Sequence, residues 1–328
     1  GLLAQGYMSV DLFFIMSGFV MAHVYGPAVR SDTLRYANFL LHRIARVYPL
    51  YIVITLALIA LSLLRGSGVA LDLPVVASNL LMLQVLGDWP SIDPPAWSIS
   101  AEACAYLLFP LIVRASLTSS KTQAVFVGLA ALGTVLALVL AARADLIGAP
   151  VGRGDLDLFY SPYSVLRCVA GFTLGQLIWR VQQAKAFARL LASGGFQRAL
   201  AAVLAISLYE RASDFLVYLL LVALVLTLSV EEGPLGRIFG SRPMLVLGKL
   251  SFGIYLLHYQ AMGFMNRAAA QLVYFEVPPA LAGLLAIAVT CTVVTSAAWF
   301  LYVFVERPSR KLLRETFGGR SRVSPALD

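Results

Sequence analysis

The stretch Trp97-Ser98-Ile99-Ser100-Ala101-Glu102-Ala103-Cys104-Ala105-Tyr106-Leu107-Leu108-Phe109-Pro110 places a single carboxylate at the start of a long apolar segment. Three prolines, Pro90, Pro94 and Pro95, precede it and mark a loop. A charge at the centre of a membrane helix costs about 2.5–3.5 kcal/mol, and less near an interface. An acid at this place usually has a partner and a function, so Glu102 is a candidate catalytic residue.

The composition of the whole chain indicates a helical membrane protein. Of its 328 residues, 60% are hydrophobic and 13% are charged, whereas a soluble domain averages about 45–50% and about 25%. Apolar runs near the ~20 residues that a bilayer requires recur from end to end, without the alternating pattern of barrel strands. We therefore predict an all-α, polytopic transmembrane helix bundle. The nine predicted spans are 8–25, 46–64, 100–116, 123–142, 163–180, 199–210, 214–230, 244–266 and 280–304. We expect the interrupted run 73–86 to be re-entrant or interfacial.

The basic residues indicate how this bundle is oriented. If the loop 26–46 lies in the cytoplasm, 19 of the 25 Lys and Arg residues fall on the inner side, as the positive-inside rule requires. The outer side or the outer helix ends keep the remaining six, Arg65, Arg143, Arg153, Arg167, Arg211 and Arg267. This orientation places the C-terminus in the cytoplasm. We expect one transmembrane domain over residues 1–314 and a solvated, poorly ordered cytoplasmic tail over residues 315–328.

Charge and cysteine usage exclude several other classes of protein. The net charge of +8 follows from the basic loops, so we predict contact with a lipid bilayer and no nucleic-acid partner. Cys104, Cys168 and Cys291 lie in separate apolar segments without a Cys-x-x-Cys pair, and the histidines do not cluster with them. Neither a disulfide framework nor a metal site is predicted.

Two motifs near the N-terminus combine charge with helical spacing. Asp11 lies near the outer start of the first span, and Phe14 and Gly18 follow at helical spacing, so another helix is expected to approach closely at Gly18. Asp11 is either a site residue or an interfacial acid that caps this helix. Arg43 and Arg46 share one helix face at the inner membrane surface, where two guanidiniums form a clamp for phosphates or anchor the helix.

Two further motifs lie in the C-terminal part of the chain. Ser251, Tyr255 and His258 are spaced by four and three residues, so they line one helix face, with His258 as either a structural or a catalytic histidine. Glu306 and Arg310 are spaced for an ion pair within one helix. In the same motif Pro308 suits the first turn of a new helix, and Arg307 belongs either to a phosphate site or to a basic flank of the last span.

The stretch 97–110 contains further candidate residues besides Glu102. Ser98 or Ser100 is placed to cap the helix, and Glu102 in its first turn is favoured by the helix dipole. Capping accounts for an acid near a helix start, but it does not account for the Trp97-Ser98 lead-in or the preceding prolines. We therefore include Trp97 and Ser98 in the candidate site.

Together and in this order, the motifs resemble the acyltransferase-3 family of integral membrane O-acyltransferases. The matching runs are Val-Asp-Leu-Phe-Phe-x-x-Ser-Gly-Phe (10–19), Arg-x-x-Arg-x-Tyr-Pro (43–49), Trp-Ser-x-Ser-x-Glu (97–102), Ser-Phe-Gly-Ile-Tyr-Leu-x-His (251–258) and Glu-Arg-Pro-x-Arg (306–310). The resemblance implies a ten-helix enzyme of the bacterial inner membrane. It transfers an acyl group, usually acetyl, from acyl-CoA to a hydroxyl of a polysaccharide, lipopolysaccharide or lipid-linked glycan. Acyl-CoA is then a co-substrate, and no bound cofactor is expected.

The resemblance also implies roles for individual residues. The family's arginine motif near the cytoplasmic surface is implicated with the donor and maps to Arg43 and Arg46, and its acid after Trp-Ser maps to Glu102. As a separate hypothesis, we expect Tyr255 and His258 to line the path of the acyl group or to stabilise the oxyanion. In the family, a helix with the histidine usually taken as catalytic precedes the first matching run. We therefore expect an N-terminally truncated member that is inactive by itself.

Two other functions are compatible with the same residues. A transporter or flippase for a glycan or lipid carrier would also have basic inner loops and an intramembrane carboxylate. A non-catalytic membrane partner is the third possibility. Acyl-CoA binding that depends on Arg43 and Arg46 is expected of the transferase and not of the transporter.

Overall fold

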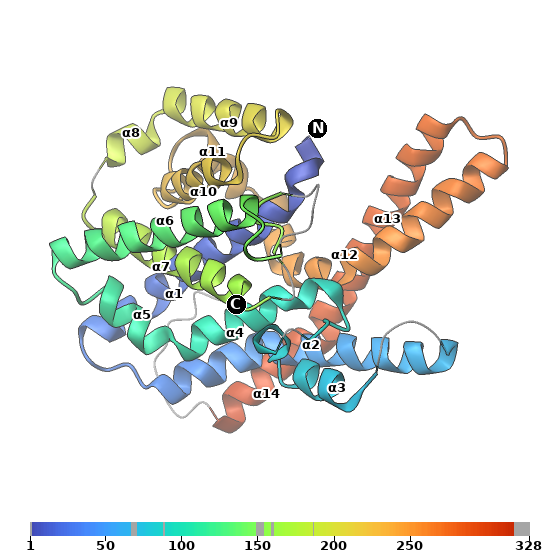
Figure 1. Cartoon of the computed structure of the whole chain (residues 1–328), viewed down its shortest axis with the longest axis horizontal. Coiled ribbons are helices and arrows are strands. Elements are labelled where there is room, and N and C mark those ends of the chain that lie inside the picture. The colour runs from blue at the N-terminus through green and yellow to red at the C-terminus, as the bar shows by residue number, and fades with distance from the viewer. Residues whose placement is uncertain are drawn as a thin grey trace. The chain divides into compact units, whose positions relative to one another are not determined.

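The computed structural model describes residues 2–66, 71–87, 89–148, 154–158, 161–185 and 187–317. The chain is 82% helical, and the described residues contain no strand, which confirms the predicted all-α class (Figure 1). Arg153 and residues 318–328 of the expected tail lie outside the described residues. The last helix ends at Phe317, so it includes the first three residues of the expected tail.

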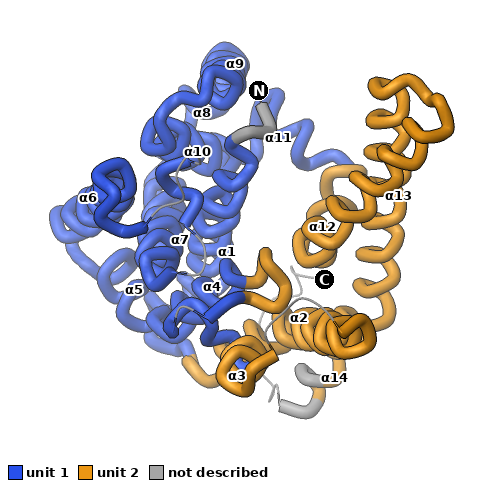
Figure 2. The backbone as a smooth tube through the Cα atoms, turned by 45° about the vertical axis from the view of Figure 1, so that its right-hand side comes forward, with its two compact units in different colours: residues 1–34, 81–90, 97–242 blue, residues 35–80, 91–96, 243–328 orange. Residues whose placement is uncertain are grey.

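The chain divides into two compact units, which Figure 2 colours separately. Unit 1 comprises residues 1–34, 81–90 and 97–242. It contains the short 3-10 segments η1 (Leu2–Met8) and η2 (Gln84–Leu86). Its α-helices are α1 (Ser9–Arg30), α4 (Trp97–Leu107), α5 (Phe109–Ser116), α6 (Lys121–Arg143), α7 (Tyr163–Gln183), α8 (Ala188–Ala192), α9 (Gly194–Tyr209), α10 (Asp214–Leu228) and α11 (Gly233–Phe239).

Unit 2 comprises residues 35–80, 91–96 and 243–328. It contains a 3-10 turn, η3 (Pro94–Ala96), and a π-helical turn, η4 (Tyr302–Glu306). Its α-helices are α2 (Tyr36–Arg65), α3 (Leu73–Leu80), α12 (Arg242–Tyr274), α13 (Pro279–Leu301) and α14 (Arg307–Phe317).

Every predicted span corresponds to a helix or to a bent pair of helices, but two helices extend well beyond the apolar runs. The helix α2 starts at Tyr36 rather than near residue 46. Phe39, Arg43 and Val47 are four residues apart and all buried, so a partly polar segment continues the helix by burying one face. The helix α12 extends from Arg242 to Tyr274, beyond the predicted run at both ends.

The predicted span 100–116 is broken. The helices α4 and α5 meet at a bend of 66°. Pro110 stands in the first turn of α5, where it lacks an N–H for the preceding turn and prevents a continuous helix. The apolar run 73–86 forms only the eight-residue α3 and the 3-10 turn η2, which agrees with its interruption by polar residues.

Four helical segments within the described ranges are long and apolar enough to cross a membrane: Gln5–Arg30, Tyr36–Arg65, Lys121–Arg143 and Pro279–Leu312. The number becomes six if the bent pairs α4/α5 and α10/α11 each form one span. The expected number of nine is therefore not confirmed by length and composition. In an apolar window of 18 residues within each segment, only 17–39% of the residues are buried, as expected of helices that contact lipid.

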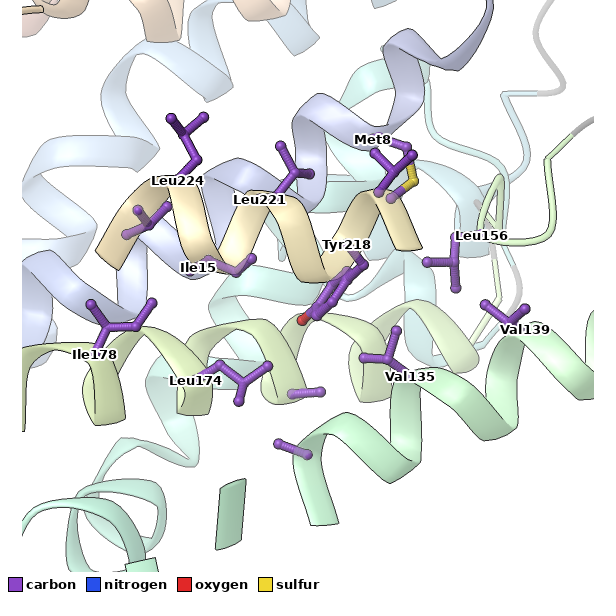
Figure 3. Packing of buried hydrophobic residues seen from close by; sticks show 14 of the residues in the cluster. Met8, Ile15, Val135, Val139, Leu156, Leu174, Ile178, Tyr218, Leu221 and Leu224 are labelled. Carbon is purple, nitrogen blue, oxygen red and sulfur yellow. The ribbon is translucent and has the colours of Figure 1, made fainter. Parts of the chain in front are cut away.

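The core of unit 1 is formed by α1, α6, α7 and α10. Figure 3 shows Ile15 of α1, Val135 of α6, Leu174 of α7 and Tyr218 of α10 packed against one another. The closest pair is α1 and α7. A Cβ added at Gly18 would lie 1.9 Å from the carbonyl oxygen of Phe172, so the two backbones meet directly there. The predicted close approach at Gly18 is confirmed.

In unit 2 the short helices α3 and α14 and the π-helical turn η4 pack against the long helix α2. The hydroxyl of Tyr48 donates a 3.0 Å hydrogen bond to the carbonyl of Leu80 at the end of α3. The side-chain oxygen of Asn79 accepts a 2.9 Å hydrogen bond from the amide of Ile92, which holds the loop before η3.

We expect Gly18→Ala to destabilise the protein, because the added Cβ meets a backbone oxygen that cannot rotate away. Overpacking of this kind costs about 1–3 kcal/mol, which is measured as a lower unfolding temperature in detergent. The matched control is Gly133→Ala in α6, where a Cβ meets no atom within 4 Å. An unfolding temperature of Gly18→Ala equal to that of the control would contradict the direct backbone contact between α1 and α7.

Candidate functional site

Glu102 is the centre of a polar cluster inside unit 1. Its Oε1 accepts a hydrogen bond from the hydroxyl of Ser17 in α1 and another, of 2.7 Å, from the hydroxyl of Tyr106 in α4. The side chain is half-buried. Its second oxygen, Oε2, accepts no hydrogen bond from the part of the chain that the structure describes. One carboxylate oxygen is therefore held by the protein, and the other is left for an external donor.

The helix that carries Glu102 is anchored at its first turn. It begins at Trp97, before both serines that were expected to cap it. The hydroxyl of Ser100 donates a 2.7 Å hydrogen bond to the carbonyl of Met82, so a capping role for Ser100 is wrong. This serine instead ties α4 to the segment that precedes η2. Trp97 and Ser98 are both buried.

Asp11 is buried in the first turn of α1 and forms a bidentate ion pair with Arg167 of α7. The Nε and Nη2 atoms of Arg167 each donate a 2.6 Å hydrogen bond to one carboxylate oxygen, and both side chains are 0% exposed. The guanidinium also donates to the carbonyl of Leu156 and lies 5.6 Å from the centre of the Trp97 ring. Asp11 is therefore an internal partner of a cation, and the alternative that it caps its helix at the interface is wrong.

A second buried acid in unit 1, Asp214, lies at the start of α10. It accepts hydrogen bonds from the Gln5 amide at 3.0 Å, the Tyr7 hydroxyl at 2.5 Å and the backbone amide of Leu156 at 2.7 Å. The carbonyl of the same Leu156 accepts the bond from Arg167. The backbone of Leu156 thus connects Asp214 directly, and Asp11 through Arg167.

In unit 2 the basic motif, Arg43 and Arg46, lies near Glu306 of the C-terminal motif. Arg43 is buried and Arg46 is half-buried on α2. Glu306, at the end of the π-helical turn, pairs with Arg310 as predicted, and its carboxylate also interacts electrostatically with Arg46. Arg307 is exposed. The helix α14 starts at Arg307, so the expected position of Pro308 in the first turn of a new helix is confirmed.

The polar stripe of α12 is present in unit 2. The Ser251 hydroxyl donates to the carbonyl of Gly248 at 2.9 Å, and the Tyr255 hydroxyl donates to the carbonyl of Pro95 at 2.9 Å. His258 is exposed, its Nδ1 bonds to the carbonyl of Tyr255, and the two rings lie 5.4 Å apart. Tyr255 therefore fixes the loop that leads into α4, and His258 stands beside it.

The same loop contains a buried acid. Asp93 is 1% exposed. Burial raises the pKa of its carboxyl to about 7, and the nearby side chain of Gln260 on α12 opposes this shift. Near neutral pH the loop therefore carries a carboxyl group that is partly protonated.

The structure thus groups the predicted residues by unit. Trp97, Ser98, Glu102 and Asp11 belong to unit 1, whereas Arg43, Arg46, Ser251, Tyr255, His258 and Arg307 belong to unit 2. In unit 1, sequence reasoning missed the second buried acid, Asp214, and the groups that hold Glu102 and Asp11, which are Ser17, Tyr106 and Arg167. A signal existed for two of them, because Arg167 is a charge inside an apolar run and Tyr106 lies one helical turn after Glu102.

The unit 1 cluster suits chemistry on a hydroxyl group. A carboxylate oxygen without a protein donor accepts a hydrogen bond from an alcohol, and the bonds to Ser17 and Tyr106 fix its direction. The described residues contain no group of three or more His, Cys, Asp or Glu that could hold a metal ion. In unit 2, Arg43 and Arg46 place two guanidiniums on α2, and guanidiniums are groups well suited to phosphate.

Comparison with known proteins supplies the family. A family model described as "Acyltransferase domain" (Acyl_transf_3) matches residues 2–303, from η1 into the π-helical turn. "Acyltransferase MdmB" of Streptomyces mycarofaciens is 27% identical over 348 residues, which cover 98% of this chain and 84% of that protein. No solved structure matches the chain.

Two other curated relatives are covered only in part. "Putative peptidoglycan O-acetyltransferase YrhL" of Bacillus subtilis (strain 168) is 23% identical over 335 residues, which cover 93% of this chain and 50% of that protein. "Protein 2 in picA locus" of Rhizobium radiobacter is 53% identical over 57 residues, which cover 17% of this chain and 29% of that protein. The chain therefore spans half or less of these two relatives.

We expect Asp11→Asn to lower the free energy of unfolding by about 3–5 kcal/mol, because it leaves the Arg167 charge buried without its partner. The double variant Asp11→Asn/Arg167→Gln removes both charges and should recover part of this loss. Unfolding in detergent measures both. The control is Lys311→Gln, which breaks an ion pair whose side chains are 78% and 64% exposed and should change little. A loss no larger than that of the control would contradict the buried pair.

We expect stability to fall between about pH 4 and about pH 7 because of Asp93. Its pKa is about 7 in the folded protein and about 4 in the unfolded chain. Between these values the folded state holds a proton that the unfolded chain has lost, so the free energy of unfolding decreases as the pH rises. Unfolding temperatures in detergent measure this slope. Asp93→Asn should reduce it, whereas Asp145→Asn on an exposed turn should not. Equal slopes in the two variants would exclude Asp93 as the cause.

Proposed function

Because this chain belongs to the acyltransferase-3 family, we propose that it moves an acyl group, most simply acetyl, from acyl-CoA to a hydroxyl of a cell-envelope glycan. Membership rests on the family match over residues 2–303. The chain is an integral membrane protein, and we assign it to the bacterial inner membrane with a cytoplasmic C-terminus.

The observation that carries the proposal is the geometry of Glu102. Its Oε1 is held by two hydroxyl donors from different helices, while Oε2 has no donor among the described residues. A carboxylate with one fixed and one unoccupied oxygen is suited to orient an alcohol. A transporter needs a charge that binds and releases its cargo, but it does not need a carboxylate held by two hydroxyls.

The reaction that fits is attack of the glycan hydroxyl on the thioester of the donor. Glu102 Oε2 accepts the hydrogen bond of this hydroxyl and directs its oxygen to the carbonyl carbon. A base takes the proton, the C–O bond forms, the C–S bond breaks, and the coenzyme A thiolate leaves and is protonated. Positioned acid–base groups contribute about 10²–10⁴-fold to such steps. Tyr255 and His258 are assigned to the path of the acyl group or to the oxyanion.

The donor is assigned to the basic motif of α2. Coenzyme A carries several phosphates, and two guanidiniums on one helix face bind such groups well. The interaction between Arg46 and Glu306 keeps the half-buried guanidinium in place. Because Arg307 is exposed at the start of α14, it is available to the same polyanion.

The contacts within unit 1 support the proposed orientation. Gln5, Arg143 and Arg211, at helix ends expected outside, line one cavity. At helix ends expected inside, Arg30 stacks over the Trp179 ring at 4.5 Å, and Arg180 donates to the carbonyl of Ser119 at 2.8 Å. The alternation of the predicted spans therefore agrees with how these helix ends meet.

The acceptor is assigned by class only. The name of YrhL refers to O-acetylation of peptidoglycan, and the polar character of the unit 1 cluster agrees with a carbohydrate hydroxyl. We therefore propose a glycan of the cell envelope as the acceptor, without choosing among polysaccharide, lipopolysaccharide and lipid-linked glycan.

Binding of labelled acetyl-CoA to the purified chain in detergent tests the proposal. Arg46→Gln should weaken binding by about tenfold or more, because a charge-assisted hydrogen bond contributes about 1.5–3 kcal/mol. Arg35→Gln, which removes an exposed charge at the start of the same helix, should change binding little. In an assay of acyl transfer in cells, Glu102→Gln should abolish acyl transfer and leave donor binding intact.

Two outcomes would contradict the proposal. If acetyl-CoA does not bind, or binds equally well to Arg46→Gln, the donor assignment fails and the transporter is favoured. If Glu102→Gln retains transfer, Glu102 does not belong to the active site.

A further inference from the structure

Two segments of unit 1 lie outside the predicted spans, at the helix ends expected inside. They are residues 181–185 with 187–198, and residues 231–241, and they contain α8, the start of α9 and α11. The helix α8 packs against α9 and α10, and α11 packs against α9 (Figure 1). The two segments therefore form one continuous surface, which we call the α8–α11 surface.

The helix α11 turns away from the direction of the neighbouring span. It meets α10 at an angle of 84°, so in a membrane crossed by α10 the helix α11 lies along the membrane surface. The structure describes α11 throughout, and none of its residues is buried. A helix in this orientation with basic and apolar side chains is typical of the membrane interface.

Gln197 of α9 holds this bend in place, and its side chain is 0% exposed. Its Nε2 donates 2.8 Å hydrogen bonds to the carbonyls of Leu191 in α8 and Glu232 before α11, and its Oε1 accepts one of 2.8 Å from the amide of Leu235. A Cβ on Gly233 would lie 2.5 Å from the same Nε2, and the φ of 80° at this residue also favours glycine. The α8–α11 surface is therefore a fixed structure and not a loop that can fold its side chains away.

Apolar side chains project from this surface. Phe187 is 69% exposed and Leu190 of α8 is 51% exposed. In α11, Ile238 and Phe239 are 54% and 48% exposed. Outside the spans these four side chains would face water, where exposed apolar area is unfavourable. They lie next to the ends of α7, α9 and α10, where an interfacial helix buries such side chains at the boundary between headgroups and acyl chains.

The same surface carries four exposed cations, which are Lys185, Arg189, Arg198 and Arg237. None of the four side chains forms a hydrogen bond or an ion pair with a residue that the structure describes. The two segments contain only two acids, Glu231 and Glu232, so the cations are in excess. Arg198 lies at the bend, because its Nη1 and the ring of Pro234 are 3.3 Å and 3.5 Å from the position that a Cβ on Gly194 would take. Guanidiniums bind phosphate oxygens well.

We propose that the α8–α11 surface binds anionic phospholipids of the cytoplasmic leaflet. Arg198 and Arg237 bind the headgroup phosphates, and the rings of Phe187 and Phe239 lie among the acyl chains. The cytoplasmic leaflet is negatively charged and attracts basic segments next to membrane spans. The inference uses the proposed orientation, but it goes beyond the proposed transfer reaction and does not require it.

Other occupants fit this surface less well. A free phosphate or a soluble polyanion would bind the cations but would leave the apolar side chains in water. A second copy that met this surface through the same face would bring like charges together, which disfavours such a dimer. A phospholipid supplies both the negative charge and the apolar chains.

Lipid binding to the purified chain tests the proposal. Native mass spectrometry of the chain in dodecyl maltoside measures the dissociation constants of phosphatidylglycerol and of phosphatidylcholine with the same acyl chains. Phosphatidylglycerol should bind about tenfold more tightly or better, and Arg198→Gln/Arg237→Gln should remove most of this preference. The control Arg211→Gln/Arg267→Gln removes two exposed arginines at helix ends expected outside and should leave the preference unchanged. Unfolding temperatures check that the variants are folded.

A second measurement locates the apolar side of the surface. In a Cys291→Ser background, which removes the exposed cysteine and keeps the buried Cys104 and Cys168, Phe239→Cys is labelled with bimane. The chain is then reconstituted in phosphatidylglycerol nanodiscs whose acyl chains carry bromine. Bromine should quench this label more strongly than a label on Asp32→Cys, which lies on an exposed polar turn expected on the same side.

Three outcomes would overturn the proposal. The first is equal affinity for the two lipids, or a preference that persists in Arg198→Gln/Arg237→Gln. The second is a label on Phe239→Cys that bromine quenches no more than the label on Asp32→Cys. The third is a dimer in the mass spectrum that Phe239→Ser disrupts, because the surface would then bind a second copy. None of these quantities depends on acyl transfer, so they separate this proposal from the proposed function.

Discussion

The buried ion pair between Asp11 and Arg167 is the interaction on which unit 1 depends. Two charges excluded from water are tolerated only when each satisfies the other and the remaining donors find acceptors. Here the guanidinium also reaches the Leu156 carbonyl and lies near the Trp97 ring. One side chain of α7 therefore sets the position of α1, of the loop before α7 and of the first turn of α4. The place of Glu102 follows from these contacts, together with the bond from Ser17.

The helices were predictable because their cause is local. A bilayer requires long apolar runs, and such runs are visible along the chain, so the all-α class and the approximate helix positions follow. Spacing also predicted the Glu306–Arg310 pair and the close approach at Gly18. The break between α4 and α5 was not predicted, although Pro110 was visible, because packing decides whether a proline bends a helix or ends it. The length of α2 was missed because a buried face, rather than a wholly apolar run, extends it.

The candidate site was predictable only in part, because its partners are distant in sequence. Glu102 was singled out as an acid before an apolar run, but its donor Ser17 is 85 residues away and the partner of Asp11 is 156 residues away. No periodicity connects such positions.

The glycine contact between α1 and α7 has a mechanical consequence. The backbone oxygen of Ile15 occupies the place that a Cβ on Gly175 would need, and that of Phe172 occupies the place that a Cβ on Gly18 would need. If α7 slid along α1 by one turn toward its own N-terminus, the indole of Trp179 would arrive where only a hydrogen atom fits. The two helices therefore hold a single register, and they serve the catalytic cycle as a stationary frame rather than as moving parts.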